Sequence, residues 1–156
     1  MMNDLEVQLG LNSHCAHLGT LAGLSRFSFQ HPALARPVQG KLFLKAPLGL
    51  TGAEVSLNVM PPGRAIPFLH KHKQNEELYI FIKGRGQVQV DGEVIDVAEG
   101  TVIRMSPTAV RSWRNHSDQD LIYIVVQYRA DSHVGSTTSD GEGVPGEPRW
   151  PDHRAE

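Results

Sequence analysis

The sequence HKHKQNEELYIFIKG occupies residues 70–84 and combines histidines, acids and an apolar run. It sets His70 and His72 two positions apart, so on an extended chain both imidazoles point to the same side. Glu77 follows at the start of an apolar run. If residues 73–76 connect two neighbouring strands, the Glu77 carboxylate comes up beside the two histidines. The stretch therefore predicts two adjacent strands that bring three chemically active side chains together.

These three side chains suit a divalent metal ion. Two imidazoles and a carboxylate can occupy one face of a metal, which leaves other positions open for water or substrate. A structural zinc site would require a fourth protein ligand, so the set indicates chemistry rather than a structural role. The ligands predicted for the metal are His70, His72 and Glu77, and the ion could be iron, manganese, zinc or nickel. The alternative is a polar loop that leads into a core strand.

The chain divides into three regions by amino-acid composition and by the spacing of its apolar stretches. Residues 1–37 mix short apolar pieces with polar breaks, and we expect a lead segment that packs on the main fold. Over residues 38–129 apolar stretches recur every eight to twelve residues or so, the spacing of a sandwich or barrel. Asp91 and Gly92 form a two-residue hairpin signal within this region. Residues 130–156 are rich in Gly, Ser, Pro and acid, which predicts a mobile tail. The fold class is all-β, a barrel of about eight strands with minor helix.

Composition excludes several classes of protein. A chain of 156 residues with 40% apolar content is long enough for one compact domain. Its net charge of -2 provides no basic field, so neither nucleic acid nor an acidic membrane surface is an expected partner. The single cysteine, Cys15, excludes an internal disulfide and fits a reducing cytoplasm. Residues 1–10 lack the apolar segment of a secretory signal, and the apolar run 121–126 is too short to cross a bilayer.

Two motifs resemble the signatures of the cupin superfamily. The first signature has a glycine, His-x-His, three or four residues, a glutamate, six residues and a glycine. Residues 63–84 match it, except that six residues, where the family usually has five, separate Gly63 from the first histidine. The second signature resembles residues 100–115, GTVIRMSPTAVRSWRN. The resemblance covers roughly residues 52–128, and its first motif is specific.

The resemblance implies a small single jelly-roll β-barrel with a metal inside it, often assembled as a homodimer. It does not imply one reaction, because this fold hosts dioxygenases, isomerases, epimerases, decarboxylases, storage proteins and sugar-binding modules. Single-barrel relatives of this type resemble sugar-phosphate isomerases.

The second motif departs from the family at its metal ligand. Arg111 stands where the family has a histidine, and Thr108 replaces a glycine. A guanidinium has no lone pair to donate, so Arg111 cannot bind a metal. Either the other three ligands still hold the metal and Arg111 binds a carboxylate or phosphate of the substrate, or the metal is lost and Arg111 pairs with Glu77 or Glu76. The second alternative predicts a binding module or a metal-independent enzyme.

Other side chains could contact the substrate. Tyr79 shares the strand face of Glu77, and Trp113 shares that of Arg111, so both join Arg111 as candidate substrate-binding residues. No catalytic residue is identified from the motifs. Glu76 and Tyr79 are the candidates for proton transfer.

We therefore expect a metal-binding cupin that acts on a small anionic polar ligand. The metal would act as a Lewis acid on a carbonyl or hydroxyl group, which suits sugar-phosphate isomerisation. An iron-dependent dioxygenase is an alternative, because two histidines and a carboxylate leave room for dioxygen and substrate. A barrel that binds a sugar or small acid without turnover is a further alternative.

Overall fold

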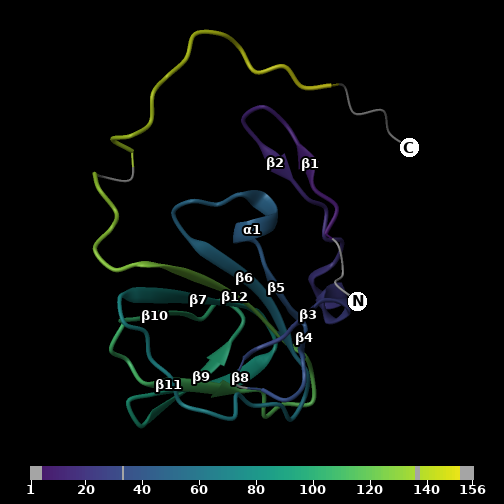
Figure 1. The fold of residues 1–156 in the computed structure, drawn as a ribbon, viewed down its shortest axis with the longest axis vertical. Coiled ribbons are helices and arrows are strands. Elements are labelled where there is room, and N and C mark those ends of the chain that lie inside the picture. The colour runs from purple at the N-terminus through teal and green to yellow at the C-terminus, as the bar shows by residue number, and fades with distance from the viewer. Residues whose placement is uncertain (1–4, 33, 136–137, 152–156) are drawn as a thin grey trace.

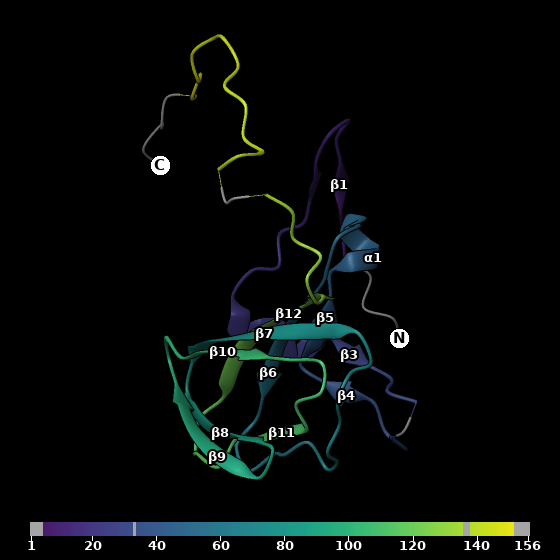
Figure 2. The same ribbon diagram turned by 90° about the vertical axis from the view of Figure 1, so that its left-hand side faces the viewer.

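The computed structural model describes residues 5–32, 34–135 and 138–151, and its regular structure is mostly β. Two antiparallel sheets face each other, one of five strands in the order β10-β7-β12-β6-β5 and one of three in the order β11-β8-β9 (Figures 1 and 2). The larger sheet comprises β5 (Lys41–Phe43), β6 (Glu54–Met60), β7 (Asn75–Lys83), β10 (Val102–Met105) and β12 (Leu121–Arg129). The smaller comprises β8 (Arg85–Val90), β9 (Glu93–Ala98) and β11 (Arg111–Arg114). The predicted all-β fold is confirmed.

The inner face of the larger sheet follows from the two-residue period of a strand. Along β7, Glu77, Tyr79 and Phe81 are buried, whereas the residues between them are only partly buried. The antiparallel register continues this face onto β12, where Tyr123 lies opposite Phe81 and Val125 lies opposite Tyr79. The core cluster between the sheets contains Met60, Tyr79, Phe81, Val88, Val97, Met105, Ala109, Trp113, Leu121, Tyr123 and Val125.

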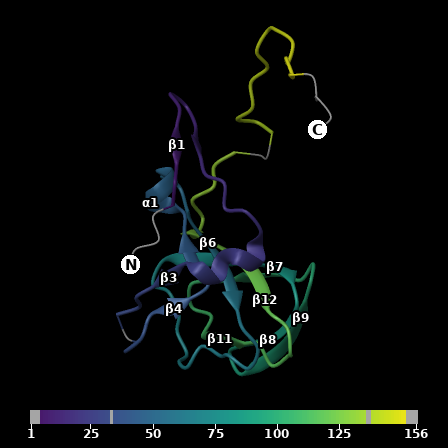
Figure 3. The same cartoon turned by 90° about the vertical axis from the view of Figure 1, so that its right-hand side faces the viewer.

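The outer face of the larger sheet is covered by the N-terminal segment. The 3-10 helix η1 (Leu21–Arg26) lies across this face, as Figure 3 shows, and its Leu24 is fully buried. A second apolar cluster joins this helix to the sheet through Leu24, Phe27, Leu57, Val59 and Ile122. The short strands β3 (Ser28–Phe29) and β4 (Val38–Gln39) pair with each other and lead into β5. Burial of these apolar side chains attaches residues before β5 to the barrel.

Two segments extend away from the barrel (Figures 1 and 2). One is the hairpin of β1 (Gln8–Leu9) and β2 (His14–Cys15), which is tied to the short helix α1 (Lys45–Leu48) by a 3.0 Å hydrogen bond between His14 Nδ1 and the carbonyl oxygen of Leu48. The other comprises residues 131–135 and 138–151, which contain no helix or strand. Its Trp150 is 83% exposed. The mobility of this tail and the three domain boundaries stay predictions.

Two turns show why glycine stands where the sequence has it. Asp91 (φ 50°) and Gly92 (φ 91°) both adopt positive φ and join β8 to β9, which confirms the predicted hairpin. Gly84, the last glycine of the first motif, has φ 88° and joins β7 to β8. A Cβ there would lie 2.2 Å from the carbonyl oxygen of Asp120. Close backbone approach therefore requires glycine at this position.

The histidine segment differs from the predicted strand. The connection was expected over residues 73–76, but β7 starts inside that range. His70 forms an isolated bridge with Arg111, in which each backbone N–H donates to the other residue's carbonyl, at 3.1 and 2.9 Å. The His72 N–H donates to the carbonyl of Pro107 at 2.9 Å. The segment is therefore an extended edge beside β11 rather than a continuous strand, because its backbone finds partners at only a few positions.

No helix among the described residues is long and apolar enough to cross a membrane.

Candidate metal centre

The three predicted ligands come together inside the barrel. One ligand atom each from His70, His72 and Glu77 lies within 4.8 Å of the other two, and this is the one such group found in the described parts of the chain. His72 Nε2 lies 3.2 Å from Glu77 Oε1. The two imidazole rings are perpendicular, with centroids 5.7 Å apart. The spacing of the motif thus brings the histidine segment and the start of β7 to one point.

His70 is prepared to donate a lone pair. Burial, followed by the charge of Arg111, lowers the pKa of His70 from 6.5 to about 4, so the ring is neutral at neutral pH. Its Nδ1 atom is buried and has no hydrogen-bond partner among the described residues. A buried polar atom without a partner is costly, and a metal or a ligand group would satisfy it. The residues present therefore fit a divalent metal.

Glu77 uses its two carboxylate oxygens differently. Oε2 accepts hydrogen bonds from Arg111 Nη2 at 2.5 Å and from the Tyr79 hydroxyl at 2.9 Å. Oε1 faces His72 and accepts a longer bond of 3.2 Å from Gln127 Nε2. Burial opposes ionisation of the Glu77 carboxyl, but the hydrogen bond and charge of Arg111, together with the other two donors, outweigh it and lower the pKa. The carboxylate is ionised, and Oε1 is the oxygen placed to bind a metal.

Arg111 is fully buried and is engaged within the protein. Besides its bond to Glu77, its Nη1 donates to the carbonyl of Ala109 at 2.9 Å, and its Nε is buried without a partner among the described residues. This pairing with Glu77 is the one expected from the metal-free alternative. It does not prevent Oε1 from binding a metal. Since the guanidinium cancels the charge of the carboxylate, a metal dication at the triad would lack compensation, and an anion in its open positions would supply it.

Tyr79 and Trp113 border the triad. Tyr79 is 1% exposed, and burial, followed by the charge of Glu77, raises the pKa of its phenol well above 10. It therefore stays protonated and donates to Glu77. The Trp113 ring lies edge-on to His70, with centroids 5.7 Å apart, and its Nε1 donates to the Tyr123 hydroxyl at 2.8 Å. Their roles as substrate contacts stay predictions.

Glu76 lies on the other side of the sheet. Alternate residues of a strand face opposite ways, so Glu76 points away from the triad that its neighbour Glu77 joins. Its carboxylate pairs with Arg104, at 2.5 Å from Nη2, and the Arg104 side chain is 64% exposed. The hydrogen bond from Arg104 lowers the pKa of Glu76. This position does not favour the proton-transfer role suggested for Glu76.

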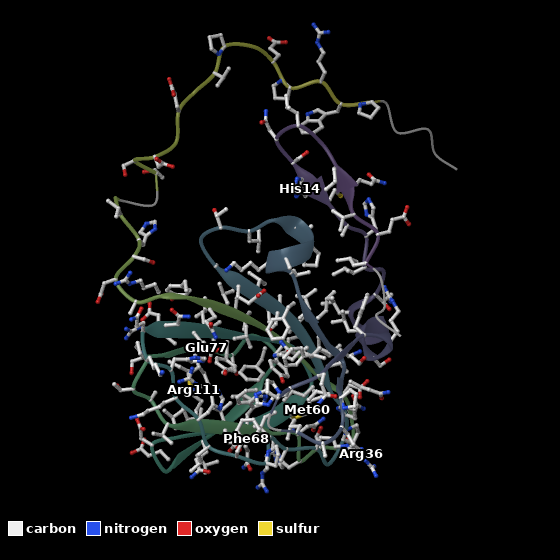
Figure 4. The ribbon with its side chains drawn as sticks, in the orientation of Figure 1. His14, Arg36, Met60, Phe68, Glu77 and Arg111 are labelled. Atoms are coloured by element: carbon white, nitrogen blue, oxygen red, sulfur yellow. The ribbon has the colours of Figure 1, made fainter. Side chains whose placement is uncertain are left out.

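Sequence reasoning missed two polar residues that face the barrel interior. Gln127 lies directly opposite Glu77 in the β7–β12 register, and its Nε2 is 3.3 Å from His72 Nε2. Lys41 lies opposite Asn58 on the inner face of β5. A signal existed for both: each is a polar residue at an inward position of an otherwise apolar strand. Figure 4 shows Glu77 and Arg111 close to each other between the sheets, beneath β7.

The fold and the motif together define the class of this protein. Residues 56–127 match the family model described as Cupin domain. A cupin protein of Bacteroides fragilis has a crystal structure that aligns with a TM-score of 0.66 and 37% identity, over 75% of this chain and 98% of that one. The chain belongs to the cupin family.

Two further proteins are similar to parts of the chain. An uncharacterized protein of Methanocaldococcus jannaschii is 32% identical over 65 residues, which cover 42% of this chain and 52% of that protein, about half its length. A sugar phosphate isomerase from a cupin superfamily, of Silicibacter pomeroyi, aligns with a TM-score of 0.52 and 21% identity, over 58% of this chain and 60% of that one. The second similarity is one of fold alone.

Proposed function

We propose that the barrel binds one divalent metal ion through His70, His72 and Glu77 and acts on a small anionic polar substrate. Isomerisation of a sugar phosphate is the reaction it suits best. The observation that carries the proposal is the convergence of three ligand atoms within 4.8 Å of one another. The buried Nδ1 of His70, which has no partner in the described structure, supports it. The fold shared with the Silicibacter pomeroyi isomerase agrees with the reaction class by analogy.

The surrounding residues prepare the triad for this chemistry. A bound divalent metal would act as a Lewis acid on a carbonyl or hydroxyl oxygen. Arg111 and Tyr79 hold Oε2 of Glu77, which orients the carboxylate and leaves Oε1 toward His72. The His72 side chain is 25% exposed, compared with 8% for Glu77. A substrate therefore approaches from the histidine side.

Metal loading and turnover test the proposal together. The protein is reconstituted separately with iron, manganese, zinc and nickel, and interconversion of aldose and ketose phosphates is followed without oxygen. We expect one metal per chain and turnover, both lost in His72→Ala and kept in His116→Ala, which changes an exposed histidine. Wild-type protein that binds no stoichiometric metal, or His72→Ala protein that binds it normally, would refute the metal site. Turnover only with iron and oxygen would replace isomerisation by dioxygenase chemistry.

A second candidate is a metal-free barrel that binds a sugar or small acid. It is favoured by the pairing of Glu77 with Arg111 and by the Gln127 amide between Glu77 and His72. Ligand binding that survives chelator treatment, without turnover, would support this candidate. The homodimer also stays a prediction, and light scattering of the purified protein would test it.

A further inference from the structure

Lys41 places an ammonium group on the inner face of the barrel. Its Nζ donates to Asn58 Oδ1 at 2.9 Å and to Ser56 Oγ at 3.4 Å. Both partners are almost fully buried, at 2% and 3% exposure. The Asn58 amide is fixed in turn by its bond to the carbonyl of Tyr123 at 3.3 Å. An ammonium has three N–H donors, so these two acceptors leave one for a ligand.

The charge of Lys41 has no adjacent counter-ion. The described residues contain no carboxylate oxygen within 4.0 Å of its nitrogen. Burial lowers the pKa of Lys41 from 10.5 to about 8, and the more distant charges of Glu77 and Glu54 oppose this effect. A cation in such surroundings is stabilised when an anion binds beside it. Arg111, by contrast, already has its counter-ion in Glu77.

A row of aromatic rings joins Lys41 to the triad. The Lys41 nitrogen lies 4.7 Å from the centroid of the Phe43 ring. From Phe43 the ring contacts continue at centroid distances of 4.8, 6.2, 5.3 and 5.9 Å through Phe29, His31 and Phe68 to His70. Figure 4 shows Phe68 on the side of the barrel opposite β7. A continuous chain of ring contacts therefore leads from the Lys41 ammonium to His70.

We propose that Lys41, rather than Arg111, is the residue that binds the anionic group of the substrate. The ligand class is a small molecule with an oxyanion, phosphate or carboxylate, at one end and a carbonyl or hydroxyl oxygen at the other. The oxyanion meets the Lys41 ammonium, and the oxygen at the other end meets the metal triad. The contact with the metal triad rests on the proposed function, whereas the contact with Lys41 does not.

Anion titration of lysine variants tests the proposal. Inorganic phosphate and malonate are titrated calorimetrically into metal-loaded and metal-free protein, which separates phosphate from carboxylate recognition. Lys41→Met should weaken binding of the preferred anion roughly tenfold or more, the loss expected for a charge-assisted hydrogen bond. Lys41→Arg should keep most of the affinity. Lys83→Met removes an exposed lysine at the end of β7 and should leave the affinity unchanged.

Because Lys41→Met removes the donor to two buried acceptors, a second variant is tested beside it. Lys41→Gln keeps N–H donors on the side chain but removes the charge, so it should also weaken anion binding. Unchanged anion affinity in folded Lys41→Met or Lys41→Gln protein would overturn the inference, as would wild-type protein that binds neither probe. Metal content is measured on the same samples. If the protein holds no metal but still shows Lys41-dependent anion binding, the proposed metal-dependent function is refuted and the role of Lys41 is not.

Discussion

Arg111→Met removes the cation of the buried pair while keeping an unbranched side chain. Arg111 is fully buried and Glu77 is 6% exposed, so the substitution leaves a buried carboxylate without its counter-ion. Removal of one partner of a buried ion pair typically lowers the free energy of unfolding by about 3–5 kcal/mol. For a domain of this size that corresponds to a decrease in Tm of about 10 °C. Urea unfolding followed by circular dichroism measures the loss.

The pH dependence of this loss identifies Glu77 as its origin. In the wild type the pKa of Glu77 is lowered in the folded state, so its ionised form stabilises the fold above the unfolded pKa, and this contribution is lost as the pH falls through the folded pKa. Without Arg111, burial dominates and raises the pKa of Glu77, so the variant takes up a proton at higher pH. The stability difference between wild type and Arg111→Met should therefore be largest near neutral pH and shrink on acidification.

Two controls accompany the measurement. Glu77→Gln introduced into Arg111→Met removes the uncompensated charge and should recover part of the loss. Arg114→Met changes an exposed arginine on the same strand and should have little effect. A loss below about 1 kcal/mol, the range of exposed pairs, would contradict the expectation of an uncompensated buried charge at Glu77. So would a loss that is the same at neutral and at acidic pH.

Three further predictions concern single positions. Gly84→Ala should destabilise the protein by about 1–3 kcal/mol more than Gly92→Ala, because both residues have positive φ but only Gly84 lies against a backbone carbonyl; equal denaturant midpoints would contradict this. Tyr79→Phe should lower the free energy of unfolding by about 1–3 kcal/mol and raise the pKa of Glu77, since the carboxylate loses a donor; an unshifted Glu77 resonance in an NMR titration would argue against the bond. Malonate binding should weaken as the pH rises through about 8, because Lys41 then loses its proton; affinity independent of pH over this range, or an equal decline in Lys41→Arg, would exclude the ammonium.

Much of the fold and the triad followed from local rules. The two-residue period of a strand correctly placed Glu77, Tyr79 and Phe81 on one buried face. The Asp91-Gly92 dipeptide predicted the hairpin because the turn requires positive φ at both residues, and both residues tolerate it. The spacing of the first motif predicted that Glu77 reaches the two histidines, and their ligand atoms do converge.

The rest depended on contacts between segments that are distant in the chain. Arg111 could reach either a substrate or a carboxylate, and only the packing of β11 against β7 shows its bond to Glu77. Gln127 is 50 residues from Glu77, and the strand register alone brings them together. Lys41 likewise lies opposite Asn58 through the pairing of β5 with β6. The alternation within each strand indicates that Gln127 and Lys41 point inward, but the identity of the strand that lies opposite is a long-range contact that local sequence does not specify.

Anomalous diffraction from crystals of the reconstituted protein, collected at the absorption edge of the metal, tests the metal centre most directly. We expect one peak per chain, about 2.0–2.2 Å from a nitrogen of His70, a nitrogen of His72 and an oxygen of Glu77. A barrel without a peak at this point, in which Gln127 still donates to Glu77, would contradict the proposed metal site.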